Sequence, residues 1–464
     1  MRLDSARNGD PVARDSIDYV HATVAQLVQA LLHREVSALE LCDAAIARIE
    51  ERDAAINAVV VRDFERARAQ ARLADARLAS GEHAPLLGVP MTVKEAFDVA
   101  GLPTTWGLAP FRDHVATRDA VAVARLKHAG AVILGKTNVP TALGDWQSVN
   151  PLYGRTVHPK DAARTPGGSS GGAAAALASG MVALELGSDI GGSIRVPAHF
   201  CGVFGHKPTY GLLPQRGHAV PGSDGADRTE IAVIGPLARS ADDLATALDV
   251  LAGPDEDDAV AYSSRLPSSR VRTLPDARIL VLDTHPCAAT ATSLRAAIAR
   301  LALDLERAGA KVARESALLP DLERAHHHYT RMLGTVTSRG VPEAKSISAH
   351  DWLSLIDEQH RLRVQWQTLF GSFDAVIAPC FGTVAFAHLE SSESPHRLFV
   401  DGVATPYEDQ LAWPGVATFP GLPATAVPID QDAEGWPIGV QVIGPRLEDR
   451  TPIAMAALIA NLRA

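Results

Sequence analysis

Pro-Gly-Gly-Ser-Ser-Gly-Gly at residues 166–172 and Ser-Asp-Ile-Gly-Gly-Ser at residues 188–193 bound the stretch that decides the fold. Each motif places a serine, Ser169 or Ser193, among glycines. Glycine adopts positive φ angles easily and lets other groups approach the main chain closely. The two motifs therefore indicate a site in which a serine hydroxyl reacts and unshielded backbone N–H groups bind a negative charge.

The run between the two motifs, residues 173–187, is rich in alanine and leucine. Alanine and leucine have high helix propensity, so this run predicts a helix. A helix that starts near Gly171 directs its unpaired N–H groups at the first glycine motif.

Upstream, the apolar residues 88–93 predict a short buried strand that ends at Lys94. Lysine is rarely buried without a partner, and a lysine that reaches the surface is the alternative reading. A buried lysine loses the solvation of its ammonium form, which lowers its pKa from the usual value of about 10.4. Such an amine can serve as the base that a serine nucleophile needs. Glu95 follows directly and, on a strand, points to the opposite face.

Residues 130–137 match the phosphate-binding pattern G-x-x-x-x-G-K-T, in which Lys136 would contact phosphate. A phosphate loop is open and follows a strand, whereas here the four middle residues are themselves apolar and predict the strand. Pro140 also disfavours a helix that starts at Thr137. A nucleotide site is therefore disfavoured.

Residues 167–172 also fit G-x-S-x-G, centred on Ser169 or Ser170, which is the nucleophile elbow of α/β-hydrolases. That elbow follows a hydrophobic strand, but residues 160–166 are polar and end in proline. A flexible Gly/Ser linker remains a second reading of the motif when it is considered alone.

No metal or cofactor is expected. The three histidines at residues 326–328 are adjacent on a predicted helix, where successive side chains point in different directions and cannot all bind one ion. The four cysteines are scattered and show no metal-binding spacing.

Composition narrows the class of protein. The chain has 464 residues, 47% of them hydrophobic, and a net charge of −10, which argues against a nucleic-acid partner. The N-terminus lacks the apolar core of a secretory signal, and no apolar run is long enough to span a membrane. We therefore expect a soluble, cytoplasmic protein with free thiols and no membrane partner.

Strand and helix patterns alternate along the chain, which predicts an α/β fold with helices on both faces of one sheet. Residues 1–20 form a polar tail, and no break in composition divides residues 21–464 into two domains. The strand patterns lie at residues 88–93, 131–134, 231–234, 278–282, 373–378, 424–428 and 438–443. The helical patterns lie at residues 21–79, 119–128, 240–251 (with Ser240 as N-cap), 292–308, 318–370 and 452–462.

Five segments in this order resemble the amidase signature family: residues 88–94, 135–138, 166–172, 187–195 and 205–209. The resemblance extends from about residue 21 to the C-terminus, is dense over residues 87–211 and returns at residues 413–445. It implies a single large domain with a mixed, mostly parallel, twisted β-sheet. It also implies that residues of about 254–410 vary and shape the substrate site.

The resemblance implies a Ser-cisSer-Lys triad. Ser193 matches the nucleophile, Ser169 the bridging serine after a cis peptide bond, and Lys94 the base; Gly168 is the least encumbered residue for the position before Ser169. The implied oxyanion and substrate contacts are Ile190, Gly191, Gly192, Ser193 and Ser169. The implied supporting residues are Ser170, which supports the site through hydrogen bonds, Asp189, which holds the loop, and Arg195, which is structural rather than a substrate anchor.

The expected activity is hydrolysis of a small carboxylic acid amide through an acyl-serine. Residues 143–147 and 329–366, with Trp146 and Trp413 as core or acyl-pocket residues, are the expected substrate-shaping segments. An A-type subunit of a glutamine-dependent tRNA amidotransferase is the alternative within the family. A P-loop NTPase and a non-catalytic binding scaffold are disfavoured alternatives of other classes, and a homodimer is compatible with the sequence.

Overall fold

A computed structural model describes residues 20–463 except 224–227, 340, 342–343, 345 and 391–394. The expected tail, residues 1–20, lies outside the described residues except for Val20. The described chain forms one sheet of eleven strands. Their spatial order is β1 (Val59–Arg62), β3 (Val132–Thr137), β2 (Pro90–Lys94), β6 (Leu184–Asp189), β8 (Val233–Ala238), β7 (Phe204–Lys207), β14 (Ala424–Gln431), β15 (Pro437–Ile443), β11 (Ala375–Pro379), β9 (Arg278–Val281) and β10 (Lys311–Ala313).

The sheet is mixed, as expected. Strands β3, β2 and β6 are parallel in one wing, and strands β11, β9 and β10 are parallel in the other. The strands from β6 through β8, β7, β14 and β15 to β11 pair antiparallel, as do β1 and β3. The description "mostly parallel" therefore holds for the two wings and not for the centre of the sheet.

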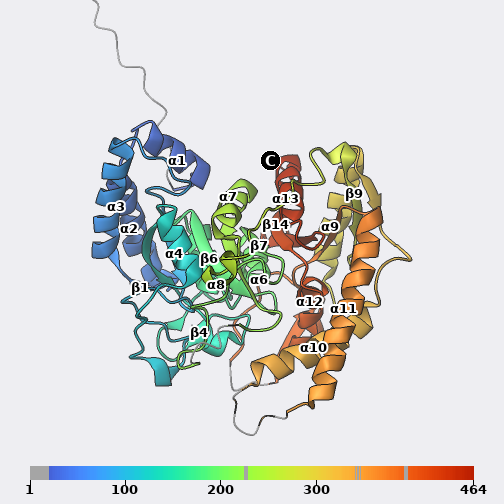
Figure 1. Cartoon of the computed structure of the whole chain (residues 1–464). Coiled ribbons are helices and arrows are strands. Elements are labelled where there is room, and N and C mark those ends of the chain that lie inside the picture. The colour runs from blue at the N-terminus through green and yellow to red at the C-terminus, as the bar shows by residue number, and fades with distance from the viewer. Residues whose placement is uncertain are drawn as a thin grey trace, which may run out of the picture.

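Helices cover the sheet on both faces and at both ends (Figure 1). Helices α5 and α6 contact each other and the central strands, and α7 and α13 form a second pair against the same region. The blue helices α1–α3 lie at one end of Figure 1, and α9–α11 lie at the other. The helices are α1 (Val24–Leu32), α2 (Ala38–Arg52), α3 (Phe64–Ala79), α4 (Val121–His128), α5 (Gly171–Ala178), α6 (Arg195–Cys201), α7 (Ala241–Leu251), α8 (Glu256–Ala259), α9 (Thr292–Arg307), α10 (Leu322–Thr337), α11 (Ala349–Ser372), α12 (Ala412–Thr418) and α13 (Arg450–Arg463).

The predicted helix between the two glycine motifs is right at its start and wrong at its end. Helix α5 begins at Gly171, but it stops at Ala178. Gly180 has a φ of 70°, a left-handed conformation that often ends a helix. Strand β6 then occupies the end of the run. Every residue of β6 is buried, including Glu185, Ser188 and Asp189, and its leucines continue the alanine- and leucine-rich run, so the sequence did not separate this strand from the helix before it.

The helical prediction for residues 21–79 is also incomplete, because strand β1 lies between helices α2 and α3. Its sequence Val-Val-Val-Arg is rich in the β-branched residues that favour strands. By contrast, the predicted N-cap of α7 is confirmed: the Ser240 side chain accepts a hydrogen bond from the Asp243 N–H.

Two short hairpins lie outside the main sheet: β4 (Val149–Asn150) with β5 (Gly154–Arg155), and β12 (Arg397–Val400) with β13 (Val403–Pro406). All four cysteines are free. Among the described residues, no helix combines the length and the hydropathy that crossing a bilayer requires.

Candidate active site

The three residues predicted to be catalytic lie at one edge of the sheet. Lys94 is the last residue of β2, and Ser193 follows the end of β6. These strands are adjacent and parallel, with Thr92 paired to Glu185, so their carboxyl ends lie at the same edge. Ser169 lies just before helix α5, which packs against both strands. The fold therefore brings together segments that are far apart in the sequence.

Lys94 is fully buried, and its amine forms hydrogen bonds with two serine hydroxyls. Its Nζ lies 2.6 Å from Ser169 Oγ and 2.9 Å from Ser188 Oγ. Burial lowers the pKa of Lys94 to about 7, although the negative charge of Asp189 acts in the opposite direction. Near neutral pH a large fraction of this amine is therefore uncharged, which is the state a base requires.

The backbone around Ser169 has the predicted geometry. The peptide bond between Gly168 and Ser169 is cis. A Cβ on Gly168 would collide with the backbone of Asp145 and Trp146, so glycine is required there by space. Ser170 ties this segment to the second motif: its N–H donates to Ser193 O over 3.1 Å, and its hydroxyl donates to Ser188 O over 3.3 Å.

Asp189 holds the second glycine motif in place. Its carboxylate accepts hydrogen bonds from the N–H groups of Gly192, over 2.9 Å, and Ile194, over 3.0 Å. The Gly192 N–H, which the resemblance assigns to the oxyanion site, therefore already donates to a carboxylate in this structure. Within the described chain, the N–H groups of Ile190, Gly191 and Ser193 have no hydrogen-bond acceptor.

Asp189 also forms a fully buried ion pair with Arg195, with 2.8 Å between Oδ1 and Nη2. Burial alone would raise the pKa of Asp189, but the charge and hydrogen bonds of Arg195, together with the Lys207 charge and the Ile194 N–H, outweigh burial and lower that pKa to about 2. Arg195 further donates to Pro414 O, Gln441 Oε1 and Thr418 Oγ1. Its donors are thus used inside the protein, which fits a structural residue rather than a substrate anchor.

Three contacts of the site were not predicted from the sequence. Ser188 is the second partner of Lys94. The Tyr329 hydroxyl donates to Ile190 O over 2.8 Å, and the Trp146 indole donates to Gly191 O over 2.8 Å. Ser188 lies inside the second motif, directly before Asp189. Because successive side chains on a strand point to opposite faces, this position could have indicated that Ser188 and Asp189 make different contacts. No sequence signal links Tyr329, on helix α10, to this loop.

Further expectations concern the contact between Ser169 and Ser193 and the roles of Trp413 and Trp146. Among the described residues, no hydrogen bond joins the hydroxyls of Ser169 and Ser193, so the structure brings Ser169 to Lys94 but does not bond it to Ser193. Trp413 is buried, and its indole donates to Thr290 Oγ1. Trp146 is also buried in the core. Both tryptophans thus follow the core interpretation.

The structure also explains the phosphate-loop pattern and the three adjacent histidines, which had suggested other kinds of site. Gly135, Lys136 and Thr137 belong to strand β3, and the buried Lys136 amine donates to Pro103 O and Thr104 Oγ1. This strand is not a phosphate loop. The three histidines lie on α10, and no cluster of three metal-binding side chains occurs in the part of the chain that the structure describes.

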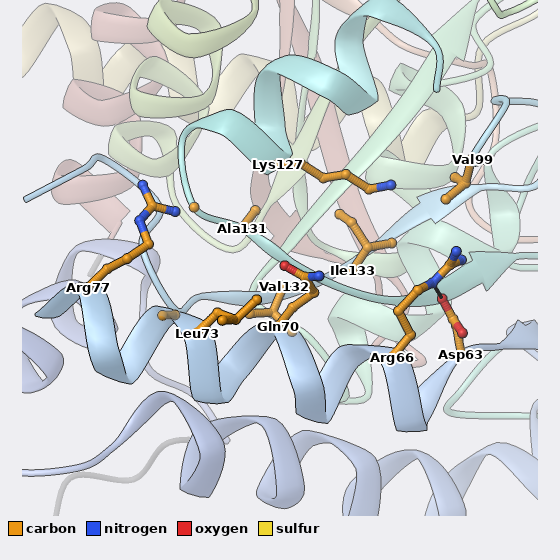
Figure 2. A pocket seen from close by; sticks show the side chains of 12 residues that line it. Asp63, Arg66, Gln70, Leu73, Arg77, Val99, Lys127, Ala131, Val132 and Ile133 are labelled. Atoms are coloured by element: carbon orange, nitrogen blue, oxygen red, sulfur yellow. Dashed lines mark hydrogen bonds and ion pairs between the residues drawn. The ribbon is translucent and has the colours of Figure 1, made fainter. Parts of the chain in front are cut away.

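A surface cavity between helix α3 and strand β3 lies apart from the catalytic residues (Figure 2). Three cations line it, but each already has an acidic partner. Arg66 pairs with Asp63, Arg77 with Glu82 and Lys127 with Asp119. The cavity therefore offers no unpaired charge for an anion.

Comparison with known proteins gives consistent matches over most of the chain. The family described as Amidase matches residues 40–338 and 323–452. The chain is 35% identical to the A subunit of glutamyl-tRNA(Gln) amidotransferase from Roseiflexus castenholzii, covering 92% of this chain and 93% of that protein. It is 31% identical to Fatty-acid amide hydrolase 2-A of Danio rerio, covering 93% and 86%. A solved crystal structure of an amidase aligns with a TM-score of 0.79 and 27% identity, covering 96% of this chain and 100% of that one.

Proposed function

This chain belongs to the amidase family, whose members are hydrolases of amide carbon–nitrogen bonds, and from that premise we propose that it cleaves a carboxylic acid amide through an acyl-serine intermediate. The products are the acid and ammonia or an amine. The observation that carries the proposal is the buried amine of Lys94, held 2.6 Å from the Ser169 hydroxyl with its pKa lowered by burial to about 7.

The reaction begins with proton transfer. Uncharged Lys94 accepts a proton from Ser169, and Ser169 accepts one from Ser193. The Ser193 oxygen then forms a bond to the amide carbonyl carbon, and the electron pair of the C=O bond moves onto its oxygen. This step requires the Ser169 and Ser193 hydroxyls to move into hydrogen-bonding distance when the substrate binds, as catalytic contacts often do.

The negative oxygen needs donors already in place. The N–H groups of Ile190, Gly191 and Ser193 are available for it, whereas the Gly192 N–H is bonded to Asp189. Removal of one such donor typically costs about 3–4 kcal/mol in transition-state stabilisation. Asp189 acts on this step indirectly, because its carboxylate fixes the loop that carries the donors.

The intermediate collapses when the carbon–nitrogen bond breaks. The proton held by Lys94 returns through Ser169 to the leaving nitrogen, which departs as ammonia or an amine. A water molecule then adds to the acyl-serine, gives its proton to the same relay and releases the acid with Ser193 restored.

A second candidate is an A-type subunit of a glutamine-dependent amidotransferase. The 35% identity to the A subunit of such an enzyme, over 92% of this chain, favours it. A protein of this kind would hydrolyse glutamine and pass the ammonia to its partners. The two candidates share the serine chemistry and differ in the acyl group and in the need for partners.

Amide hydrolysis assays on the purified chain, without partner proteins, distinguish the two candidate functions. We expect it to release ammonia or amine from members of a panel of aliphatic, aromatic and peptide amides, and the Ser193→Ala variant to release none. Activity confined to glutamine and dependent on added partner proteins would instead support the amidotransferase. Failure on every amide, with no labelling by a fluorophosphonate, would contradict the proposed hydrolysis. The homodimer stays a prediction that the molar mass in solution tests.

A further inference from the structure

The loop that carries the oxyanion donors contains two consecutive glycines, Gly191 and Gly192, and Gly192 has a φ of 91°. Glycine gives the backbone many accessible conformations. Peptide units flanked by such residues can rotate, and a rotated unit would direct its N–H away from the substrate. The loop therefore needs hydrogen bonds from outside to keep each unit in one orientation.

Each carbonyl of the loop has such a bond. Ile190 O accepts from the Tyr329 hydroxyl and Gly191 O from the Trp146 indole, both over 2.8 Å. Gly192 O accepts from the Val196 N–H over 2.7 Å, and Ser193 O from the Ser170 N–H over 3.1 Å. These donors come from four separate segments of the chain.

We propose that Tyr329 is a positioning residue that fixes the direction of the Gly191 N–H toward the oxyanion, an inference that rests on the proposed function. The C=O of Ile190 and the N–H of Gly191 belong to one planar peptide unit, in which they point in opposite directions. A donor that holds the carbonyl at one end therefore sets the direction of the N–H at the other. Within the described chain, that N–H has no acceptor of its own.

The packing around Tyr329 restricts the movement of its side chain. Its side chain is fully buried on helix α10. Its ring lies so close to Gly415 that a Cβ there would come within 2.6 Å of Tyr329 Cδ1. Burial raises the pKa of the Tyr329 hydroxyl far above its usual range, so the hydroxyl stays a donor at any working pH.

The neighbouring peptide unit provides an internal comparison. Between Gly191 and Gly192, the Trp146 indole holds the C=O and the Asp189 carboxylate holds the N–H. That unit keeps one restraint when Trp146 is replaced, and its N–H donates to Asp189. Among the described residues, the peptide unit between Ile190 and Gly191 is held by the Tyr329 hydroxyl alone. Loss of the Tyr329 hydroxyl should therefore impair catalysis more than loss of the Trp146 indole N–H.

The test compares three variants on one amide that the wild type hydrolyses. Tyr329→Phe keeps the ring and removes the hydroxyl, and we expect kcat to fall about 10- to 100-fold, below the loss for a fully removed donor, with KM within about threefold. Tyr407→Phe is the matched control, because this buried tyrosine donates to Asp145 and, among the described residues, forms no hydrogen bond with residues 190–193. Trp146→Phe should lower kcat less than Tyr329→Phe.

A second readout reports on the oxyanion site itself. A phenylboronic acid forms a tetrahedral adduct with a reactive serine, and its affinity should fall in Tyr329→Phe by about the same factor as kcat. The thermal midpoints of Tyr329→Phe and Tyr407→Phe should agree within a few degrees. A kcat and boronate affinity in Tyr329→Phe within twofold of the wild type would overturn the inference. A wild type that hydrolyses no amide would instead overturn the proposed function.

Discussion

The amine nitrogen of Lys94 lies 2.6 Å from the hydroxyl oxygen of Ser169, in a place where burial rather than a nearby cation lowers the lysine pKa. Its second partner, Ser188, is also an uncharged hydroxyl. Asp189 opposes the shift through its charge, but Asp189 is paired with Arg195. The ion pair therefore supports the loop while leaving the lysine free to lose its proton.

The pH dependence of the reaction follows from this pKa. Protonated Lys94 cannot accept a proton, so kcat/KM for a neutral amide should rise with pH through about 7 and fall about tenfold per pH unit below it. The measurement is a pH–rate profile, with intrinsic fluorescence to establish that the protein stays folded at low pH. A folded enzyme whose kcat/KM is unchanged between pH 5 and pH 8 would show that another group is the base.

Replacing Ser188 with alanine should shift that profile to lower pH. The Ser188 oxygen accepts a hydrogen bond from the Lys94 amine and stabilises its ammonium form. A hydrogen bond to a charged group is worth about 1.5 kcal/mol or more, which corresponds to about one pH unit. Ser170→Ala is the control, because the Ser170 hydroxyl bonds the Ser188 backbone and not Lys94. If the acidic limb of the pH–rate profile stays in place or moves to higher pH in Ser188→Ala, this role is refuted.

Asp189→Asn should destabilise the protein strongly. The substitution leaves the buried Arg195 guanidinium without its counter-charge, and breaking a buried pair in this way costs about 3–5 kcal/mol. Denaturant unfolding measures the loss. The exposed pair of Asp249 with Arg450, at 2.7 Å, is the control, and Asp249→Asn should cost less than about 1 kcal/mol. Equal losses in the two variants would mean that the buried pair contributes no special stability.

Gly168→Ala should abolish activity or folding, because its Cβ would collide with the backbone of Asp145 and Trp146. Gly334→Ala is the matched control: this glycine lies within helix α10, and no atom lies within 4 Å of an added Cβ. Alanine favours a helix over glycine by up to about 1 kcal/mol, so this variant should be as stable as the wild type or more stable. Activity and thermal midpoint measure both. A Gly168→Ala variant with full activity would contradict the crowding that the structure describes.

The sequence was sufficient to predict the site residues whose positions depend on local motifs. Lys94 ends a short apolar strand, and Ser169 and Ser193 stand in glycine-rich turns next to the strand ends that converge at one edge. The order of these motifs carried the family resemblance. The start of helix α5 was predictable for the same reason, since it follows directly from a glycine motif.

Contacts that depend on tertiary placement were not predictable. Tyr329 reaches the oxyanion loop from a helix more than a hundred residues later in the chain, so no spacing indicates their contact. The bond from the Gly192 N–H to Asp189 depends on how the loop folds back on its own carboxylate. Strand β6 was missed because its leucines continue the alanine- and leucine-rich run, and because its polar residues, Glu185, Ser188 and Asp189, are buried and do not mark an exposed face.

In the proposed mechanism Ser193 carries the acyl group, and the uncharged amine of Lys94 activates it. The most direct measurement is mass-spectrometric mapping of the protein after treatment with a fluorophosphonate at pH 8. We expect one adduct, on Ser193, in the wild type, no adduct in Ser193→Ala, and labelling in Lys94→Ala slowed by at least about 100-fold, as for loss of a general base. An adduct on another residue, or a Lys94→Ala variant labelled as fast as the wild type, would contradict the account.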